Sequence, residues 1–553
     1  MKKVKSFKAM ITLVVIIATN LFGYSQPNFL WAKQAGGANN DNGNEIAVDG
    51  SGNSYITGGF QGTATFGNTT LTSAGEYDLF IAKIDKDGNF LWAKKVGGVG
   101  PEYGNSIAVD GSGNSYITGF FYGTATFGNT TLTSAGYDIF IAKTDASGNF
   151  LWAKKAGGTN YDSGNSIAVD GSGNSYITGY FFGTATFGNT TLTSAGWTEI
   201  FIAKIDASGN FLWAKKAGGT NNDYGYSIAV DGSGNSYTIG GFEGTATFGN
   251  ISLTSVKDSN GKFTKDIFIT KLDANGNFLW AKKAGGTDID SGNSIAVDGS
   301  GNSYITGSFD GTITFGNNTL TSSGSSDIFI AKLDGSGNYL WAKKTGGTSV
   351  DSGNSIAVDG SGNSYITGFF YGTATFGNTT LTSAGGGDVF ISKLDNNGNF
   401  IWTKKADGTG DDSGNSIAID GSGNSYTIGN FQGTATFGNT TLTSAGYDIF
   451  IAKIGTITTG NEEIVIPKVL ELSQNYPNPF DNSTNIEFTL FNPSKIKLTV
   501  FNSFGQVVDV IVDEFLFAGN HSYTWNLKNV ASGMYFYQLN VDGNKEVKRM
   551  VKR

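Results

Sequence analysis

Residues 149–209 read NFLWAKKAGGTNYDSGNSIAVDGSGNSYITGYFFGTATFGNTTLTSAGWTEIFIAKIDASG, and this stretch decides the fold because the chain contains seven versions of it. A tryptophan near the start marks each copy, at Trp31, Trp92, Trp152, Trp213, Trp280, Trp341 and Trp402. Successive tryptophans lie 60 or 61 residues apart, with one interval of 67. A fixed period of this length predicts equal units that pack against one another.

Each copy contains four runs with the composition of β-strands. In this copy they are FLWAKKAG, SIAVD, SYITG and EIFIAKID. Gly-, Asn- and Asp-rich segments separate them and supply the positive-φ positions of tight turns. We interpret the segment GTATFGNTTLTSAG as a long loop. Four antiparallel strands per unit is the composition of a β-propeller blade.

The repeat array does not begin with the first strand of a blade or end with the fourth. It opens with a fourth strand at residues 29–36 and closes with a third strand at residues 448–454. Pairing these two segments completes a seventh blade, closes the ring and covers edges that would otherwise template aggregation. The predicted fold class is therefore all-β, with a seven-bladed propeller of four-stranded blades over residues 26–455.

The repeats resemble the SBBP-type β-propeller repeat of bacterial surface and secreted proteins. The matching segments are SIAVDGSGNSYITG, FGNTTLTSAG and DIFIAKID. This resemblance implies a fold and does not imply an activity.

The net charge argues against nucleic-acid binding, and the cysteine content excludes cysteine-dependent chemistry. The formal net charge is −9, so nucleic acid, which proteins usually bind through a basic face, is not an expected partner. The chain has no cysteine, which excludes disulfides, a thiolate nucleophile and cysteine-ligated zinc.

Residues 1–25 have the pattern of a secretory signal peptide. A lysine-rich start precedes an apolar run at residues 9–22, and the small residues Gly23 and Ser25 precede a cut between Ser25 and Gln26. The apolar run is short for a membrane span. We therefore expect a secreted mature chain without a transmembrane segment.

The C-terminal part has a different composition. Residues 456–470 lack the repeat pattern and form a predicted linker, and residues 471–553 contain six or seven short strand-like runs. This number of strands suits a small immunoglobulin-like β-sandwich.

This segment resembles the type A C-terminal sorting domain of the type IX secretion system of the Bacteroidetes. The matching stretches are LSQNYPNPFDNST, FNSFGQVV, ASGMYFYQL and KEVKRMVKR, and the sorting motif comprises Tyr476, Pro477, Asn478, Pro479 and Phe480. The resemblance implies export through the secretion machinery, removal of the domain by a surface sortase-like protease, and release or attachment at the outer-membrane cell surface.

Catalytic signatures are sparse. The single histidine is His521, in the C-terminal segment, so histidine-dependent triads and HExxH metal sites are excluded from the repeats. No cofactor motif is present, and we predict a non-enzymatic protein without a cofactor. Two carboxylates could still cleave a glycan, which keeps a polysaccharide-active enzyme as the alternative.

An acidic residue occupies the same slot in every copy, between the fourth strand and the first strand of the next blade. The set is Asp41, Glu102, Asp162, Asp223, Asp290, Asp351 and Asp412. In a closed propeller these connections lie on one face near the channel, which predicts a ring of seven like charges. Such a ring is costly unless it is solvated, hydrogen-bonded or bound to cations. Cation binding, with calcium as one candidate, and capping of each residue's own loop are both open.

Aromatic residues distinguish some copies from others. They flank the last phenylalanine of the second strand in three blades, at Phe120, Tyr122, Tyr180, Phe182, Phe369 and Tyr371. The other four blades carry glycine or polar residues there. We predict a ligand platform for a glycan or an extracellular protein, with packing under the long loop as the alternative.

These features together predict a secreted or cell-surface propeller that acts as a recognition or adhesion module. The alternatives are the carboxylate-based polysaccharide-active enzyme and a purely structural surface protein.

Overall fold

The computed structural model describes residues 27–456, 470–490, 494–517, 519–526, 530–541 and 544–553. The chain divides after Ile457 into two compact units. The predicted signal peptide with its Ser25–Gln26 cut, and nearly all of the predicted linker, lie outside the described residues.

The first unit consists of four-stranded antiparallel sheets that follow the sequence repeat. In the first sheet, β2 (Asp41–Val48), β3 (Ser54–Phe60), β6 (Asp78–Ile84) and β7 (Phe90–Val96) pair in that order. We call each such sheet a blade and number the blades along the chain.

Blades 2 to 6 repeat this arrangement. Blade 2 contains β8 (Glu102–Val109), β9 (Ser115–Phe127), β10 (Thr130–Thr144) and β11 (Phe150–Ala156), and blade 3 contains β12 (Ser163–Val169), β13 (Ser175–Phe187), β14 (Thr190–Ile205) and β15 (Phe211–Ala217). Blade 4 contains β16 (Asp223–Val230), β17 (Ser236–Glu243), β20 (Lys265–Leu272) and β21 (Phe278–Gly285), blade 5 contains β22 (Asp290–Val297), β23 (Ser303–Phe309), β26 (Asp327–Leu333) and β27 (Tyr339–Gly347), and blade 6 contains β28 (Asp351–Val358), β29 (Ser364–Phe370), β32 (Asp388–Leu394) and β33 (Phe400–Gly408).

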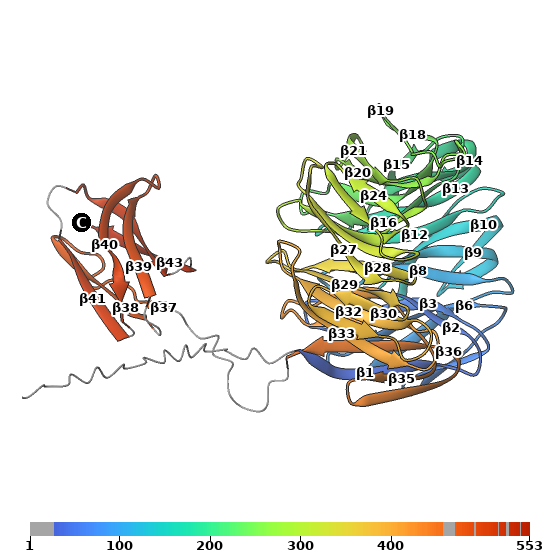
Figure 1. The fold of residues 1–553 in the computed structure, drawn as a ribbon, viewed down its shortest axis with the longest axis horizontal. Helices are drawn as coiled ribbons and strands as arrows, with labels where there is room; N and C mark the ends of the chain where they lie inside the picture. The colour runs from blue at the N-terminus through green and yellow to red at the C-terminus, as the bar shows by residue number, and fades with distance from the viewer. Residues whose placement is uncertain (1–26, 457–469, 491–493, 518, 527–529, 542–543) are drawn as a thin grey trace, which may run out of the picture. The chain divides into compact units, whose positions relative to one another are not determined.

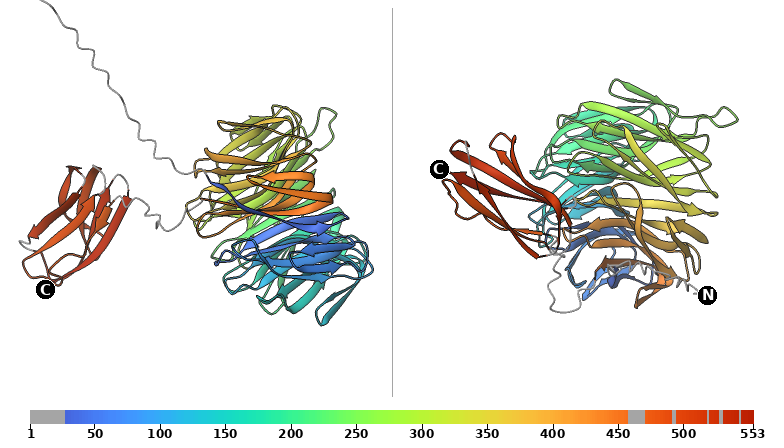
Figure 2. Two further views of the ribbon diagram at one scale, coloured as in Figure 1. Left: turned by 90° about the horizontal axis from the view of Figure 1, so that it is seen from below. Right: turned by 60° about the vertical axis from the view of Figure 1, so that its left-hand side comes forward.

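The last blade joins the two ends of the repeat array. It contains β34 (Ser413–Ile419), β35 (Ser425–Phe437), β36 (Thr440–Gly455) and, as its outer strand, β1 (Asn28–Gly37). β1 pairs antiparallel with β36, and Ala32 lies opposite Ala452. The N-terminal strand therefore lies beside the strands of the last repeat (Figures 1 and 2). The predicted all-β propeller fold is confirmed.

Our interpretation of the segment GTATFGNTTLTSAG as a long loop is wrong, because this segment forms a β-hairpin. In blade 1 the hairpin comprises β4 (Thr63–Phe66) and β5 (Thr69–Thr72), and β4 also pairs with β1 of the preceding blade. The alternation of TATF explains the strand, since Ala64 and Phe66 are buried while Thr63 and Thr65 are exposed.

The hairpin recurs in every repeat. It is separate in blades 4, 5 and 6, as β18 (Thr245–Phe248) with β19 (Ile251–Thr254), β24 (Thr312–Phe315) with β25 (Asn318–Thr321), and β30 (Thr373–Phe376) with β31 (Thr379–Thr382). In blades 2, 3 and 7 it continues the second and third strands.

The hydrophobic cores lie between neighbouring blades. One core joins Tyr55 and Ile81 of blade 1 to Ile117 and Phe121 of blade 2, and each blade junction has an equivalent cluster. The cluster at the closing junction joins blade 7 to blade 1. Each blade therefore depends on both neighbours for the burial of its two faces.

The second unit contains two antiparallel sheets around one core. β37 (Leu470–Leu472), β38 (Ser483–Leu490) and β41 (Gly519–Asn526) form one sheet, and β40 (Val507–Leu516), β39 (Ser494–Asn502), β42 (Gly533–Val541) and β43 (Asn544–Lys552) form the other. Side chains of both sheets, including Ile486 and Leu539, share the core. The immunoglobulin-like classification of this unit stays a prediction.

We predict that the substitution Ala32→Asp destabilises the propeller more than Leu30→Asp in the same strand. Ala32 is 6% exposed and packs in the core beside β36, whereas Leu30 is 37% exposed. An unpaired charge at a buried position costs roughly 3 kcal/mol or more, so thermal unfolding should show a much larger decrease in Tm for Ala32→Asp. Equal, small decreases would contradict the packing of β1 in the closing blade.

Candidate functional site

An aromatic cluster covers the ends of strands in blades 1 to 4. Consecutive ring centroids lie 4.6–6.0 Å apart along this cluster, which comprises Tyr77, Tyr103, Phe120, Tyr122, Tyr137, Tyr161, Tyr180, Tyr224 and Tyr226. We call it the tyrosine cluster. Tyr122 is 48% exposed and Tyr161 is 41% exposed, so the cluster presents ring surface to solvent.

The structure brings three of the six predicted platform residues into this cluster, namely Phe120, Tyr122 and Tyr180. Phe182 lies apart from them and stacks on Trp197, which is 65% exposed. These observations fit a platform in blades 2 and 3, but ligand binding by these residues stays a prediction.

The remaining two platform residues form a separate pair in blade 6. The rings of Phe369 and Tyr371 lie 5.8 Å apart, and the Tyr371 hydroxyl donates to Asp411 Oδ1 at 3.0 Å. This bond fixes the Tyr371 side chain against the neighbouring loop.

Six members of the tyrosine cluster were missed in the sequence, although a signal was present. Tyr103 and Tyr224 directly follow the repeated acidic residue, where most other copies have serine, and Tyr161 directly precedes it. Tyr77 and Tyr137 directly precede the acidic residue that begins the third strand. Tyr226 stands where the other six copies have asparagine. Comparison of copies column by column would have identified all six.

A pocket adjoins the cluster at the one long insertion among the repeats. It measures about 410 Å³, and its lining includes Tyr224, Tyr226, Glu243, Phe263 and Lys265. The Lys265 Nζ lies 5.7 Å from the centre of the Tyr226 ring, and burial lowers the pKa of Lys265. The insertion therefore adds both charge and shape beside the exposed aromatic rings.

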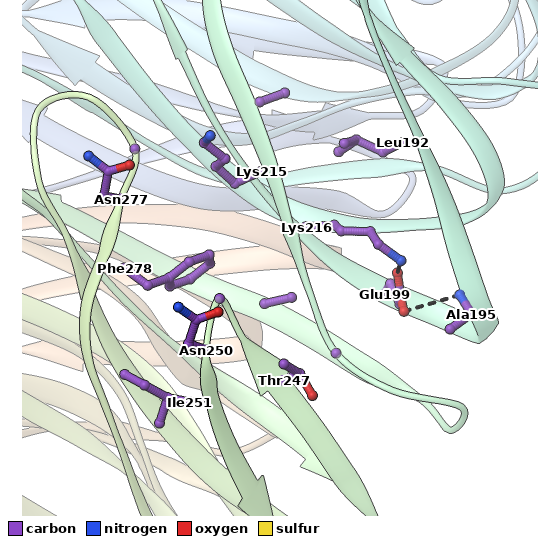
Figure 3. A pocket seen from close by; sticks show the side chains of 15 residues that line it. Leu192, Ala195, Glu199, Lys215, Lys216, Thr247, Asn250, Ile251, Asn277 and Phe278 are labelled. Atoms are coloured by element: carbon purple, nitrogen blue, oxygen red, sulfur yellow. Dashed lines mark hydrogen bonds and ion pairs between the residues drawn. The ribbon is translucent and has the colours of Figure 1, made fainter.

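A larger groove lies elsewhere, between blades 3 and 4 (Figure 3). It measures about 670 Å³ and is lined by Lys215, Lys216, Asn250 and Phe278, with Lys216 paired to Glu199 at 3.1 Å. An equivalent groove of about 430 Å³ is lined by the corresponding residues between blades 5 and 6. Because it recurs, this groove reflects the repeat and identifies no individual site.

The seven acidic residues of the repeated slot are all buried, with exposed fractions of 0–2%. Backbone amides satisfy part of each group: the Gly158 N–H donates to Asp162 Oδ2 at 2.8 Å and the Phe182 N–H to its Oδ1 at 3.0 Å. The carboxylates of Asp162, Asp223 and Asp351 therefore hold the connection before their own blade to the end of the second strand. Glu102 and Asp290 bond to the connection, and Asp41 and Asp412 bond to the end of the second strand. This is the loop-capping arrangement that the sequence left open.

A second buried acidic residue accompanies each of the seven, at the start of the third strand of the preceding blade. Asp138 and Asp162 both flank Gly157, where a side chain would clash with both carboxylates and the backbone has a φ of 139°. Asp138 also pairs with Lys155 at 3.0 Å. Two carboxylates and one ammonium group leave a net negative charge in this buried junction.

These pairs do not converge on a common point. Among the described residues, no three histidine, aspartate or glutamate side chains lie close enough to bind one metal ion. Cation binding by the ring of seven acidic residues stays a prediction.

Burial raises the pKa of every carboxyl group in the slot. The pKa of Asp41, Asp223 and Asp412 rises to about 7, that of Glu102 and Asp290 to about 8, and that of Asp162 and Asp351 to about 6. The neighbouring carboxylate adds to the effect of burial at Asp290. Each junction is thus suited to hold a proton near neutral pH.

We predict that the propeller loses stability as the pH rises from 5 to 9. A pKa raised in the folded state means that protonation favours folding, so this stabilisation is complete below the unfolded pKa near 4 and is lost as the pH rises through 6–8. The substitution Asp290→Asn keeps an acceptor for the Gly286 N–H at 2.8 Å and removes one titrating group.

As the pH rises, the unfolding free energy of the Asp290→Asn variant should decrease less than that of the unchanged protein. The difference should be up to about 1.4 kcal/mol per pH unit. The control is Asp298→Asn, in a turn where hydrogen bonds from Asn302 and Ser300 lower the pKa of the carboxyl group. Identical pH profiles for the unchanged protein and Asp290→Asn would contradict a buried proton at this junction.

The sorting motif of the second unit contacts the last strand. Phe480 is 1% exposed in the core, its N–H donates to the Val551 carbonyl at 3.1 Å, and Asn478 Oδ1 accepts from the Val551 N–H at 2.9 Å. Tyr476 is 81% exposed, and the peptide bonds before Pro477 and Pro479 are cis. The motif thus combines a buried anchor with an exposed tyrosine.

Comparison with family models matches both parts of the chain. Residues 474–553 match the model described as "Secretion system C-terminal sorting domain", and six segments match the SBBP model described as "Beta-propeller repeat", at residues 30–58, 91–119, 151–180, 212–240, 279–312 and 340–368. Both resemblances are confirmed. The sorting domain assigns the protein to type IX secretion and to the cell surface.

Curated relatives match the chain over only part of their own length. An uncharacterized WD repeat-containing protein, L264, of Acanthamoeba polyphaga mimivirus is 26% identical. The alignment covers 77% of this chain and 38% of the length of that protein. The regulatory protein FlaEY of Caulobacter vibrioides is 28% identical and covers 30% of this chain and 18% of its own.

Among solved structures, PorZ, a surface component of the type IX secretion system of Porphyromonas gingivalis, aligns with 94% of this chain and 100% of its own, at 9% identity and a TM-score of 0.15. In the described part of the present chain, no helix is long and apolar enough to span a membrane.

We predict that Phe480→Ala destabilises the second unit and reduces export, because truncation of a buried phenylalanine costs about 3–5 kcal/mol. Unfolding of the second unit and the amount of protein at the cell surface measure the two effects. Tyr476→Ala is the matched control within the motif and should leave stability nearly unchanged. If Tyr476→Ala stops export while the second unit stays folded, the secretion machinery recognises the exposed tyrosine by direct contact.

Proposed function

We propose that the propeller is a non-enzymatic recognition or adhesion module that binds an extracellular ligand across the tyrosine cluster. The observation that supports this most directly is the asymmetry of the cluster. Near-identical repeats would make all seven blades alike, yet aromatic rings extend continuously only from blade 1 to blade 4. Export by a cell-surface secretion system provides the setting in which such a surface meets ligands.

The chemistry of the cluster favours a glycan or a polypeptide. Tyrosine rings offer rigid, partly apolar contact area, and their hydroxyl groups bond to polar ligands. The adjoining pocket of about 410 Å³ contributes Glu243 and Lys265, which provide an acceptor and a donor. An extended ligand lying across the rings with one end in this pocket would use both features.

The buried acidic pairs argue against catalysis at the repeated slot. The raised pKa values of the seven slot residues belong to side chains with exposed fractions of 0–2%, which a substrate cannot contact. A carboxyl group outside the buried pairs keeps a polysaccharide-active enzyme as the second candidate function. Asp310 of blade 5 is only partly buried, and burial together with the nearby Asp288 raises its pKa. A pair of accessible carboxylates is the minimum that glycoside hydrolysis needs.

We predict that the double substitution Tyr122→Ala, Tyr161→Ala weakens ligand binding while leaving the fold intact. The purified protein would be applied to an array of glycans and extracellular-matrix proteins, and affinities for each hit would then be measured in solution. An aromatic anchor contributes about 2 kcal/mol, so each removal should weaken binding by roughly 30-fold. Both side chains are more than 40% exposed, so Tm should hardly change.

Tyr371→Ala is the control on blade 6 and should retain full affinity if the ligand lies on blades 1 to 4. Unchanged affinity of the double variant would overturn the proposal for this surface. Shortened glycan products that depend on Asp310 would establish the enzyme instead. An array without any hit would favour a structural surface protein.

A further inference from the structure

The centre of the ring contains a small polar channel. A cavity of about 150 Å³ lies there, lined by residues of the innermost strands β2, β8, β12, β16, β22, β28 and β34. Serine, asparagine and isoleucine residues make up most of the lining. The channel is separate from the tyrosine cluster except at Tyr226, which borders both the channel and the adjoining pocket.

Two layers of hydrogen bonds hold the channel wall together. In the first, the asparagine of one innermost strand donates to a glycine carbonyl of the next, at 2.9–3.1 Å; the last such bond, from Asn415 to Gly43, closes the ring. In the second, a serine hydroxyl accepts the N–H of an isoleucine in the next blade, at 3.1–3.3 Å. Each layer is formed by six of the seven blades.

The two exceptions are Glu45 and Tyr226. Blade 1 has Glu45 where the other six blades have serine, and blade 4 has Tyr226 where the others have asparagine. Glu45 accepts a hydrogen bond from the Ser416 hydroxyl at 2.7 Å. Each exchange removes the hydrogen bond to the next blade that the other copies make in that layer, although Glu45 keeps its bond to Ser416 of the preceding blade.

The exchange at Glu45 leaves the channel with an unbalanced charge. Glu45 provides the only carboxylate among the described residues that line the cavity, and no lysine or arginine lines it. Burial raises the pKa of Glu45 to about 7. Removing an ionised carboxylate from water without a cationic partner is costly. A bound cation would offset this cost.

We propose that the channel binds a calcium ion through the Glu45 carboxylate, with serine hydroxyl groups and water completing the coordination. Each channel serine uses one lone pair for the isoleucine N–H and keeps a second acceptor site. Calcium accepts six to eight oxygen ligands in irregular geometry, which suits a ring of hydroxyl groups, whereas magnesium requires a smaller, regular octahedron. A cavity of about 150 Å³ has space for the ion with part of its hydration shell.

The expected affinity is modest. A site with one carboxylate belongs with the weak calcium sites of extracellular modules, whose Kd lies at roughly 10⁻⁴–10⁻³ M. A cell-surface protein meets calcium outside the cytoplasm, so a site of this strength can be occupied. The ion would link blade 1 to its neighbours at the position where the serine layer has its one exception.

The test uses the whole protein and two readouts. Calcium binding is measured by calorimetry, and terbium, which resembles calcium in size and ligand preference, is detected by luminescence excited through tyrosine, because Tyr226 borders the same cavity. We expect calcium to raise Tm and to displace terbium. The variant Glu45→Ser, which restores the residue of the other six blades, should bind calcium at least tenfold more weakly while keeping or exceeding the Tm of the calcium-free protein.

Three further variants make the outcome decisive. Glu45→Gln keeps the shape of the side chain and should also lose calcium, which separates loss of charge from any change in packing. Tyr226→Asn should lower the terbium luminescence while calorimetry still shows calcium binding. Asp290→Asn removes a buried junction carboxylate and should leave calcium affinity unchanged.

Full calcium affinity in both Glu45 variants would overturn the proposal, and its loss in Asp290→Asn alone would place the ion at the blade junctions. Absence of calcium binding to the unchanged protein would also overturn it. The result is independent of the proposed recognition function, since Tyr122→Ala, Tyr161→Ala should bind calcium normally.

Discussion

The structure depends on burial between blades, because a single four-stranded sheet has two apolar faces and no core of its own. Each junction buries one face of two blades, and the seventh junction exists only when β1 joins β36. At every junction a tyrosine of the second strand is fully buried beneath a lysine of the third, as in Tyr55 and Lys83 at 4.7 Å. Closure is therefore a condition for the stability of all the blades and not only of the last.

Polar groups follow the same constraint. The turn after the first strand is held by its aspartate, since Asp49 Oδ1 accepts the N–H groups of Ser51 and Asn53 at 2.9 Å. At the opposite end of the strands, the buried acidic pairs hold the connections between blades. These carboxylates explain why the repeat needs acidic residues in fixed slots, and they place a titrating group at each junction. Packing and pH response are therefore properties of the same residues.

The sequence predicted the units correctly where period and alternation act locally. The four strands of each blade and the pairing of the two ends follow from SIAVD, SYITG and the phase of the array. The TATF hairpin could have been recognised from its alternation, but its partner, β1 of the preceding blade, is a tertiary contact that no local pattern gives. Likewise, the position of Asp162 in the repeat was evident, whereas its burial depends on how Gly157 and Gly158 bring two blades together.

Functional positions become visible when the repeated scaffold is used as its own reference. A residue present in all seven copies, such as the buried tyrosine, is explained by packing. A residue that departs from six equivalents at a cost to the scaffold needs another explanation, and Glu45 and Tyr226 both give up a link between neighbouring innermost strands. The tyrosine cluster follows the same logic on a larger scale, because its members stand where other copies have non-aromatic residues in the same columns.

The rigidity of the scaffold has a consequence for recognition. Some cluster residues, such as Phe120 in β9 and Tyr180 in β13, lie in strands that are paired on both sides, so little conformational entropy remains to be lost there when a ligand binds. Tyrosine side chains add few rotatable bonds to that cost. A surface of this kind gains affinity through preorganisation, and the seven repeats provide the same rigid frame whichever blades carry the aromatic residues. Variation of a few columns could thus change the ligand without disturbing the fold.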